Sequence, residues 1–161
     1  MYFDVYRRPR HLPDELITAA VLFAYDYLKL PAHITTDIFF NNKRDPFLGF
    51  ALWNEEEQSA EIFIYQWQST YQLIKTLFHE LAHIQQHWLE KLICSEDFAI
   101  KEWLGVEYAF TDRVTEAYND YPWEVDAINL ERELMAAFKE KLAITYPNLL
   151  TYLSESDIVD G

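Results

Sequence analysis

The feature that most constrains the fold is a long segment of apolar periodicity from Tyr71 to about Leu92. Its apolar side chains recur at the spacing of a helix, and Ser69 stands three residues before Gln72, which is the pattern of a helix N-cap. Between residues 76 and 86, charged and histidine side chains occur only in one short motif. A helix with so little charge has to be covered on most sides, so we expect it at the centre of the fold.

The segments around this helix predict an α+β fold. Apolar residues at helical spacing indicate a packing helix over residues 14–30, which ends before Pro31. A last helix is predicted over residues 123–141, with Pro122 in its first turn, where a missing N–H group costs little. Three stretches rich in β-branched and aromatic residues predict strands that form a small three-stranded meander: 34–40, 47–53 and 60–67.

The other segments are less regular. Apolar residues within the range 98–104 indicate a short helix that stops at Gly105. Pro147 ends any further helix, and the tail over residues 154–161 is expected to fray. Neither a linker nor an internal repeat interrupts the sequence, so residues 1–161 are predicted to form a single domain.

The composition opposes several classes of binding partner. With 13 basic and 27 acidic residues the formal charge is -14, which opposes binding to nucleic acids and to anionic lipid surfaces. The longest apolar stretch, residues 16–30, carries Asp26 and Lys29 and is too short to span a bilayer. The N-terminus lacks the apolar region of a signal peptide, and Cys94 is the only cysteine, so no internal disulfide can form. These features predict a cytoplasmic protein with no nucleic-acid or membrane partner.

The motif in the central helix is H-E-x-x-H, formed by His79, Glu80 and His83. Residues four apart share a helix face with Cβ atoms roughly 5 to 6 Å apart, so both imidazoles can reach one zinc ion at about 2.0 to 2.1 Å. Glu80 then falls beside the ion, where it can take a proton from water that the metal acidifies and pass it to a leaving amine. These residues are the minimum of a hydrolytic zinc site.

The helix resembles the extended motif of the zincin metallopeptidases, with Gln85 at a position where that pattern usually has an apolar residue. A catalytic zinc usually has three protein ligands, so a third must be found. His87 is about 12 Å along the helix axis from His79, too far to share one ion. The metzincin pattern needs a histidine where this chain has Leu89, and SprT-like proteases use a downstream histidine, whereas no histidine follows His87.

An acidic third ligand remains, and Glu124 is the best placed candidate. It begins the last predicted helix, which can lie against the motif helix, and Ala127 one turn later permits a close approach. Glu-x-x-Ala after H-E-x-x-H resembles the gluzincins, in which a glutamate on a following helix completes the site. Glu124 can alternatively be an acid that stabilises the first helical turn. Three other acids stay open as ligands or as groups that orient an imidazole: Glu116, Asp120 and Asp126.

The resemblance implies further site residues. In zincins the edge strand of the sheet commonly aligns the substrate backbone, and the strand over residues 60–67 is expected to fill that role. A hydrogen-bond donor must stabilise the developing oxyanion, and Tyr118 and Tyr121, close to Glu124 in the sequence, are the candidates. The order of elements looks like that of compact zincin domains of phage and bacterial origin, some of which cleave regulatory proteins. Those domains often have H-E-L-G-H where this chain has Ala82.

The sequence therefore predicts a zincin-like α+β fold and a zinc-dependent peptidase that acts on a peptide or protein substrate in the cytoplasm, that of a host cell if the chain is phage-encoded. Zn²⁺ is expected on His79, His83 and Glu124, with Glu80 as the general base. Two alternatives are a zincin-fold regulatory protein without turnover and a virion or assembly component in which zinc only braces the helices. The intact Glu80 argues against a loss of turnover.

Overall fold

The computed structural model describes residues 2–43, 47–109 and 118–154, so the predicted fraying of residues 155–161 lies outside the described residues. The helices are α1 (Asp14–Tyr27), α2 (Thr70–Trp88), α3 (Pro122–Thr145) and α4 (Pro147–Leu150), with short 3-10 turns η1 (Tyr118–Asp120) and η2 (Thr151–Leu153). The strands are β1 (Tyr2–Tyr6), β2 (Thr35–Asn41), β3 (Gly49–Asn54), β4 (Ser59–Tyr65), β5 (Leu92–Cys94), β6 (Ile100–Trp103) and β7 (Val106–Ala109). The predicted α+β class is confirmed.

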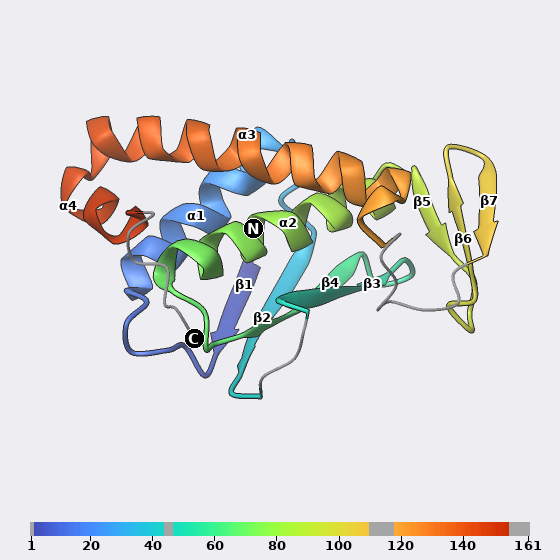
Figure 1. Ribbon diagram of the computed structural model, residues 1–161, viewed down its shortest axis with the longest axis horizontal. Helices are drawn as coiled ribbons and strands as arrows, with labels where there is room; N and C mark the ends of the chain where they lie inside the picture. Colours follow the sequence, from blue (N-terminus) through green and yellow to red (C-terminus); the bar gives the residue numbers. More distant parts are fainter. Residues whose placement is uncertain (1, 44–46, 110–117, 155–161) are drawn as a thin grey trace.

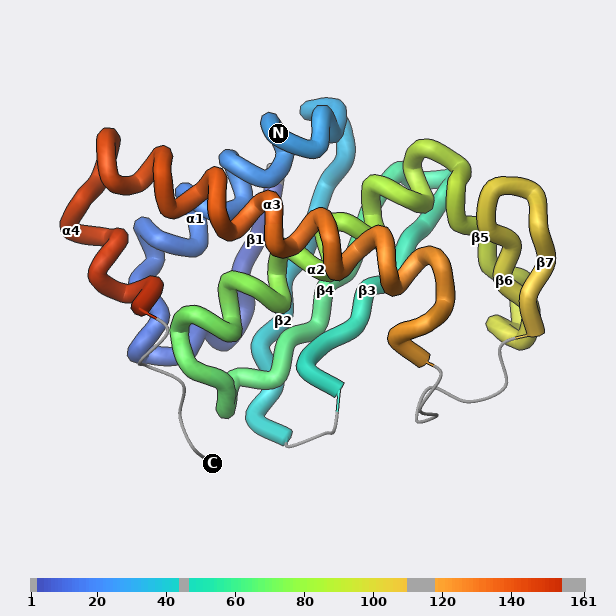
Figure 2. Tube along the Cα trace, turned by 45° about the horizontal axis from the view of Figure 1, so that its top comes forward, coloured from blue at the N-terminus to red at the C-terminus, as the bar shows by residue number. Residues whose placement is uncertain are grey.

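Helix α2 lies at the centre of the fold, between the sheet that contains β3 and β4 and the long helix α3 (Figures 1 and 2). The Ser69 hydroxyl accepts a hydrogen bond from the Gln72 N–H at 3.2 Å, so the predicted N-cap is confirmed. The helix ends at Trp88 instead of near Leu92, because Glu90 takes a left-handed backbone conformation with φ 57°. The chain therefore turns away from α2 just beyond the motif.

The main sheet differs from the predicted three-stranded meander. It has four strands in the order β1-β2-β4-β3, with β1, β2 and β4 parallel and β3 antiparallel to β4. Strands β2 and β4 each bury alternate residues, whereas every residue of β3 keeps some exposure, so β4 takes the interior place and β3 the edge. The expectation that residues 60–67 form the edge strand is therefore wrong, and the strand Gly49–Asn54 has that position.

The short helix predicted over residues 98–104 is also absent, because β5, β6 and β7 form a separate antiparallel sheet. Trp103 pairs with Val106, and the two residues between them, Leu104 and Gly105, have φ 49° and 85°. Positive φ at both positions is the geometry of a two-residue hairpin turn, so Gly105 closes a hairpin and does not end a helix. Figure 1 shows this sheet apart from the four-stranded sheet, beyond the C-terminal end of α2.

The outer helices follow the prediction more closely. Helix α3 has Pro122 as its first residue and continues to Thr145, past the predicted end at residue 141. Helix α1 ends at Tyr27, before the predicted end at residue 30, because Lys29 has a left-handed φ of 56°. Apolar side chains from α1, α2, α3 and the main sheet join in one buried core. Within the described ranges, no helix combines the length and the apolarity needed to cross a membrane.

Candidate metal centre

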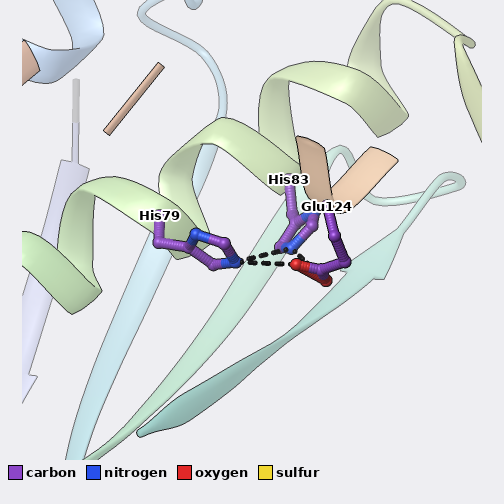
Figure 3. Close-up of side chains that lie close together, drawn as sticks. All are labelled: His79, His83 and Glu124. Carbon is purple, nitrogen blue, oxygen red and sulfur yellow. Dashed lines mark hydrogen bonds and ion pairs between the residues drawn. The ribbon is translucent and has the colours of Figure 1, made fainter. Parts of the chain in front are cut away.

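Three side chains converge where α2 meets the start of α3 (Figure 3). His79 Nε2 lies 3.0 Å from Glu124 Oε2, and His83 Nε2 lies 3.0 Å from Glu124 Oε1. The two imidazole Nε2 atoms are 3.2 Å apart. Two ligands at about 2.0 to 2.1 Å from a tetrahedral zinc lie about 3.3 Å from each other, which is close to the separation of the two Nε2 atoms, while each imidazole contacts a different oxygen of the Glu124 carboxylate. The structure therefore brings together His79, His83 and Glu124, the three residues predicted as ligands.

The local fold explains this convergence. His79 and His83 are four residues apart on α2, which places both imidazoles on the face that α3 covers. Glu124 lies in the first turn of α3 and is 2% exposed, so its carboxylate points into the protein instead of only stabilising the helix start. Ala127, one turn later, is fully buried, and its small side chain takes little of the space between the two packed helices.

Gln86 holds the second imidazole and was not predicted from the sequence. His83 Nδ1 donates to Gln86 Oε1 at 2.8 Å, which leaves His83 Nε2 directed at Glu124. The Gln86 amide N–H groups donate to the Trp123 carbonyl and to Asp126 Oδ2, each at 2.9 Å. Gln86 is fully buried, so this one side chain ties the histidine on α2 to the beginning of α3. The available signal was a polar residue one turn after His83 on a helix expected to be buried.

Glu131 lies near the Nδ1 atom of the first imidazole, at ion-pair distance. Its Oε2 atom lies 3.6 Å from His79 Nδ1, two turns along α3 from Glu124. Burial alone would lower the pKa of His79, but the contacts with Glu124 and Glu131 outweigh it and raise that pKa to about 10. The charge of Glu80 acts in the same direction. The spacing of Glu124 and Glu131 on one helix face was visible in the sequence, yet only packing shows that this face meets His79.

The remaining acids and His87 lie outside the group of three. Asp126 accepts a hydrogen bond from Gln86, which in turn contacts His83, so Asp126 is linked to the imidazole through Gln86. Asp120 is exposed in η1. Glu116 lies outside the described residues. His87 donates from Nδ1 to the Leu92 carbonyl at 3.0 Å, and burial together with the nearby charge of His83 lowers its pKa to about 4. As the helix rise requires, His87 is not part of the cluster.

Glu124 is held in its charged form. Burial would by itself raise the pKa of this carboxyl group. The charge of His83 and the hydrogen bonds from both imidazoles oppose burial and keep the pKa of Glu124 far below its ordinary range. A carboxylate that stays ionised and two imidazole Nε2 atoms directed at it make a donor set that suits zinc.

Two cavities border the centre. One of about 980 Å³ contacts His83, and another of about 450 Å³ contacts His79. Both are lined by Glu80 and Tyr118, so these two predicted catalytic residues lie at the place where the cavities meet. Tyr121 is placed differently: its ring stacks on Trp123 with centroids 4.6 Å apart, and among the described residues it does not line either cavity.

Gly49 brings the edge strand against the motif helix. A Cβ atom at this position would lie 2.7 Å from the Phe63 carbonyl oxygen and 2.9 Å from Thr76 Cγ2. It would lie 3.7 Å from Glu80 Cγ, so the contact is at the level of the predicted general base. Because only glycine lacks this atom, β3 can pass α2 here at a distance that another residue would not permit.

No relationship to a known protein contributes to the description of the site. No family model, no curated protein and no solved structure matches the chain. The features of the chain that indicate a function are the donor set, the groups that orient it and the cavities beside it.

The role of Gln86 can be tested by a substitution that keeps its volume. We expect Gln86→Met to weaken zinc binding about 10- to 100-fold, because His83 loses the acceptor that orients its ring. Gln85→Met is the matched control, since Gln85 donates to the Leu28 carbonyl at 3.1 Å and does not contact the centre. Competition with a chromophoric chelator measures both affinities, and equal effects of the two substitutions would remove Gln86 from the site. Nitrogen NMR of His83 should show the Nδ1-protonated form only while Gln86 is present.

Zinc binding should also depend on pH through His79. With a pKa of about 10 the metal-free imidazole is protonated at pH 7.5, so zinc must displace a proton there. We expect release of about one proton per zinc, and an affinity that rises about tenfold per pH unit between about pH 7 and 9. Calorimetry in buffers of different ionisation enthalpy measures this release. An affinity independent of pH in that range would contradict the raised pKa.

The same raised pKa fixes the sign of the stability effect in the metal-free protein. The contribution of the His79 contacts is complete below the ordinary histidine pKa of about 6.5 and is lost as the pH rises through about 10. Thermal unfolding of the chelated protein, compared with the His79→Gln variant, should therefore show a difference that shrinks at alkaline pH.

Proposed function

We propose that the chain is a zinc-dependent peptidase with a zincin-like fold. The observation that carries this proposal is the convergence of His79, His83 and Glu124, whose candidate ligand atoms all lie within 4.8 Å of one another, while Glu80 lines the cavities that border them. A zinc ion held by the three side chains would supply a Lewis acid that polarises a carbonyl group and acidifies a water molecule. Three protein ligands with an accessible fourth position are the arrangement of catalytic zinc sites.

The residues of the chain have distinct tasks in this proposal. Glu80 accepts the proton of the attacking water and delivers it to the leaving amine. Gln86 and Glu131 hold the two imidazoles by their Nδ1 atoms, so both Nε2 atoms keep their direction. Tyr118, at the junction of the cavities, is the better placed of the two tyrosines to donate a hydrogen bond to the developing oxyanion.

Strand β3 is suited to hold an extended peptide. It is the edge strand of the main sheet, and all 6 of its residues line the larger cavity. The backbone groups on its outer side can form a ladder with an added strand, which is a common mode of peptide recognition. A purely structural zinc site would need neither the cavities nor the edge strand.

The function is tested by incubating a proteome-derived peptide library with the purified chain in three forms: zinc-loaded, chelated, and chelated with zinc restored. We expect new peptide termini, read by mass spectrometry, in the first and third samples only. If the zinc-restored sample produces no new termini from the library, the assignment as a general peptidase is withdrawn. A non-catalytic regulatory protein would instead bind a partner equally well in forms that cannot cleave.

A further inference from the structure

The two cavities beside the metal centre form one groove. They share Gly49, Glu80, Tyr118 and Glu124 as lining residues, so they meet at the centre. The larger cavity runs along β3 toward the β5–β7 sheet, and the smaller one lies on the side of the residues that precede β3. We call the larger cavity the acidic arm and the smaller one the neutral arm, for the charged side chains that line them.

The acidic arm has a strong excess of negative charge. Away from the centre, its charged lining residues within the described ranges are Glu55, Glu57, Glu61, Glu90 and Glu96 against Lys101. The glutamates are all exposed and come from three separate places in the chain: the β3–β4 turn, strand β4, and the segments around β5. Charges of one sign around a cleft reinforce one another and attract the opposite charge more strongly than single surface charges do.

The neutral arm has no such excess. Apart from Glu131, which contacts His79 at the centre, its charged lining residue among those described is Lys75. Both arms also have apolar lining residues, such as Phe47 and Leu48 in the neutral arm and Leu52 and Trp53 in the acidic arm, so the arms differ in charge. A peptide that lies through the whole groove therefore meets a negative environment on one side of the centre and no excess of negative charge on the other.

The direction of β3 relates this asymmetry to the direction of the peptide. Along the strand, the chain passes from Phe47 and Leu48 in the neutral arm, past Gly49 at the centre, to Asn54 in the acidic arm. Antiparallel pairing is the more stable arrangement for an added strand. A peptide paired antiparallel with β3 has its N-terminal half in the acidic arm and its C-terminal half in the neutral arm.

We infer that the groove selects peptides whose basic side chains lie on the N-terminal side of the bond at the metal centre, with uncharged side chains on the C-terminal side. The inference names the substrate class of the proposed function and rests on it for the position of the bond. The net charge of -14 favours basic peptides in any orientation, whereas the unequal arms favour one orientation over the other.

The test measures binding separately from cleavage. Fluorescent peptides of equal length and composition carry their lysines either in the N-terminal or in the C-terminal half, and a third peptide has glutamine in place of lysine. Anisotropy with the zinc-loaded Glu80→Gln chain measures binding without loss of peptide. We expect the peptide with N-terminal lysines to bind about tenfold more tightly than the other two, as a few exposed charge pairs can provide. The preference should weaken as salt rises, because these charges are exposed to solvent.

Variants that remove charge show which part of the molecule causes the preference for N-terminal lysines. Glu90→Gln with Glu96→Gln removes two charges from the acidic arm and should reduce the preference to about threefold or less. Glu15→Gln with Glu140→Gln removes the same charge from exposed positions of α1 and α3 outside the groove, and the preference should remain. A preference for C-terminal lysines, no preference, or an equal loss in both variants would overturn the inference.

The binding and cleavage results separate the two proposals. If the peptide with N-terminal lysines binds best but the wild-type zinc-loaded chain cleaves none of the peptides, the peptidase function falls and the charge preference of the groove stands. If the wild type cleaves peptides without regard to the position of lysine, the function stands and the inference falls.

Discussion

Replacing Glu80 by glutamine is expected to abolish hydrolysis while zinc content and fold stay as in the wild type. The amide keeps the shape of the buried side chain, which is 5% exposed, but it cannot accept the proton of the attacking water. Loss of a general base at such a site should lower kcat by about 10²- to 10⁴-fold. Zinc content by elemental analysis, circular dichroism and cleavage of a peptide found with the library give the three measurements.

The Glu80→Gln variant also separates the functional hypotheses. A peptidase loses turnover, a regulatory protein keeps full binding to its partner, and a protein with structural zinc shows no change. Equal cleavage by wild type and Glu80→Gln would indicate a contaminating protease or a different base, and the role of Glu80 would have to be withdrawn.

Replacing Glu124 by alanine is expected to weaken zinc binding by more than about 100-fold, beyond the range of residues that only orient a ligand. Glu124 supplies the acidic donor between the two imidazoles, with 3.0 Å to each Nε2 atom. His87→Ala should leave the affinity unchanged, since His87 lies outside the cluster and donates to a backbone carbonyl. The comparison needs a chelator competition and a thermal unfolding curve for each variant.

Because Glu124 is buried, the alanine variant can also lose stability, and Glu124→Gln serves as the second variant. The neutral amide retains the volume and hydrogen bonds of the side chain but is a much poorer ligand for zinc than a carboxylate. Zinc binding that survives in Glu124→Gln and is lost in His87→Ala would reverse the choice of the third ligand.

The helices and the predicted ligands could be read from the sequence because they depend on local rules. The period of 3.6 residues, the Ser69 cap and the Pro122 start define α2 and α3, and helix geometry alone places His79 beside His83. The position of Glu124 depended on a resemblance, because the packing of α3 on α2 involves residues far apart in the chain.

The strand order could not be read in the same way. The content of β-branched and aromatic residues identifies β2, β3 and β4, but it does not say which strands are neighbours. The parallel pairing of β1 with β2 spans the whole of α1. The β5–β7 sheet was misread because its exposed apolar residues have no helical or strand period strong enough to decide. Gly105 contained the usable signal, because glycine favours the positive φ that both turn positions have, whereas leucine at position 104 is not typical of such a turn.

The roles of Gln86 and Glu131 at the site could not be predicted from the sequence. Gln86 hydrogen-bonds to one imidazole and Glu131 lies at ion-pair distance from the other, yet in the sequence each is an ordinary polar residue on a helix. Their roles follow only from the pairing of the α2 and α3 faces, which no local pattern determines.

The contact at Gly49 has a consequence for mutational tolerance. Other positions of β3, Leu52 and Asn54, have exposed side chains, so a saturation library should accept many residues there. At position 49 every substitution adds a Cβ atom within 3 Å of two groups, one of them backbone. Sequence drift along this strand should therefore leave one invariant glycine, and a lineage that replaced it would have to move the strand away from Glu80.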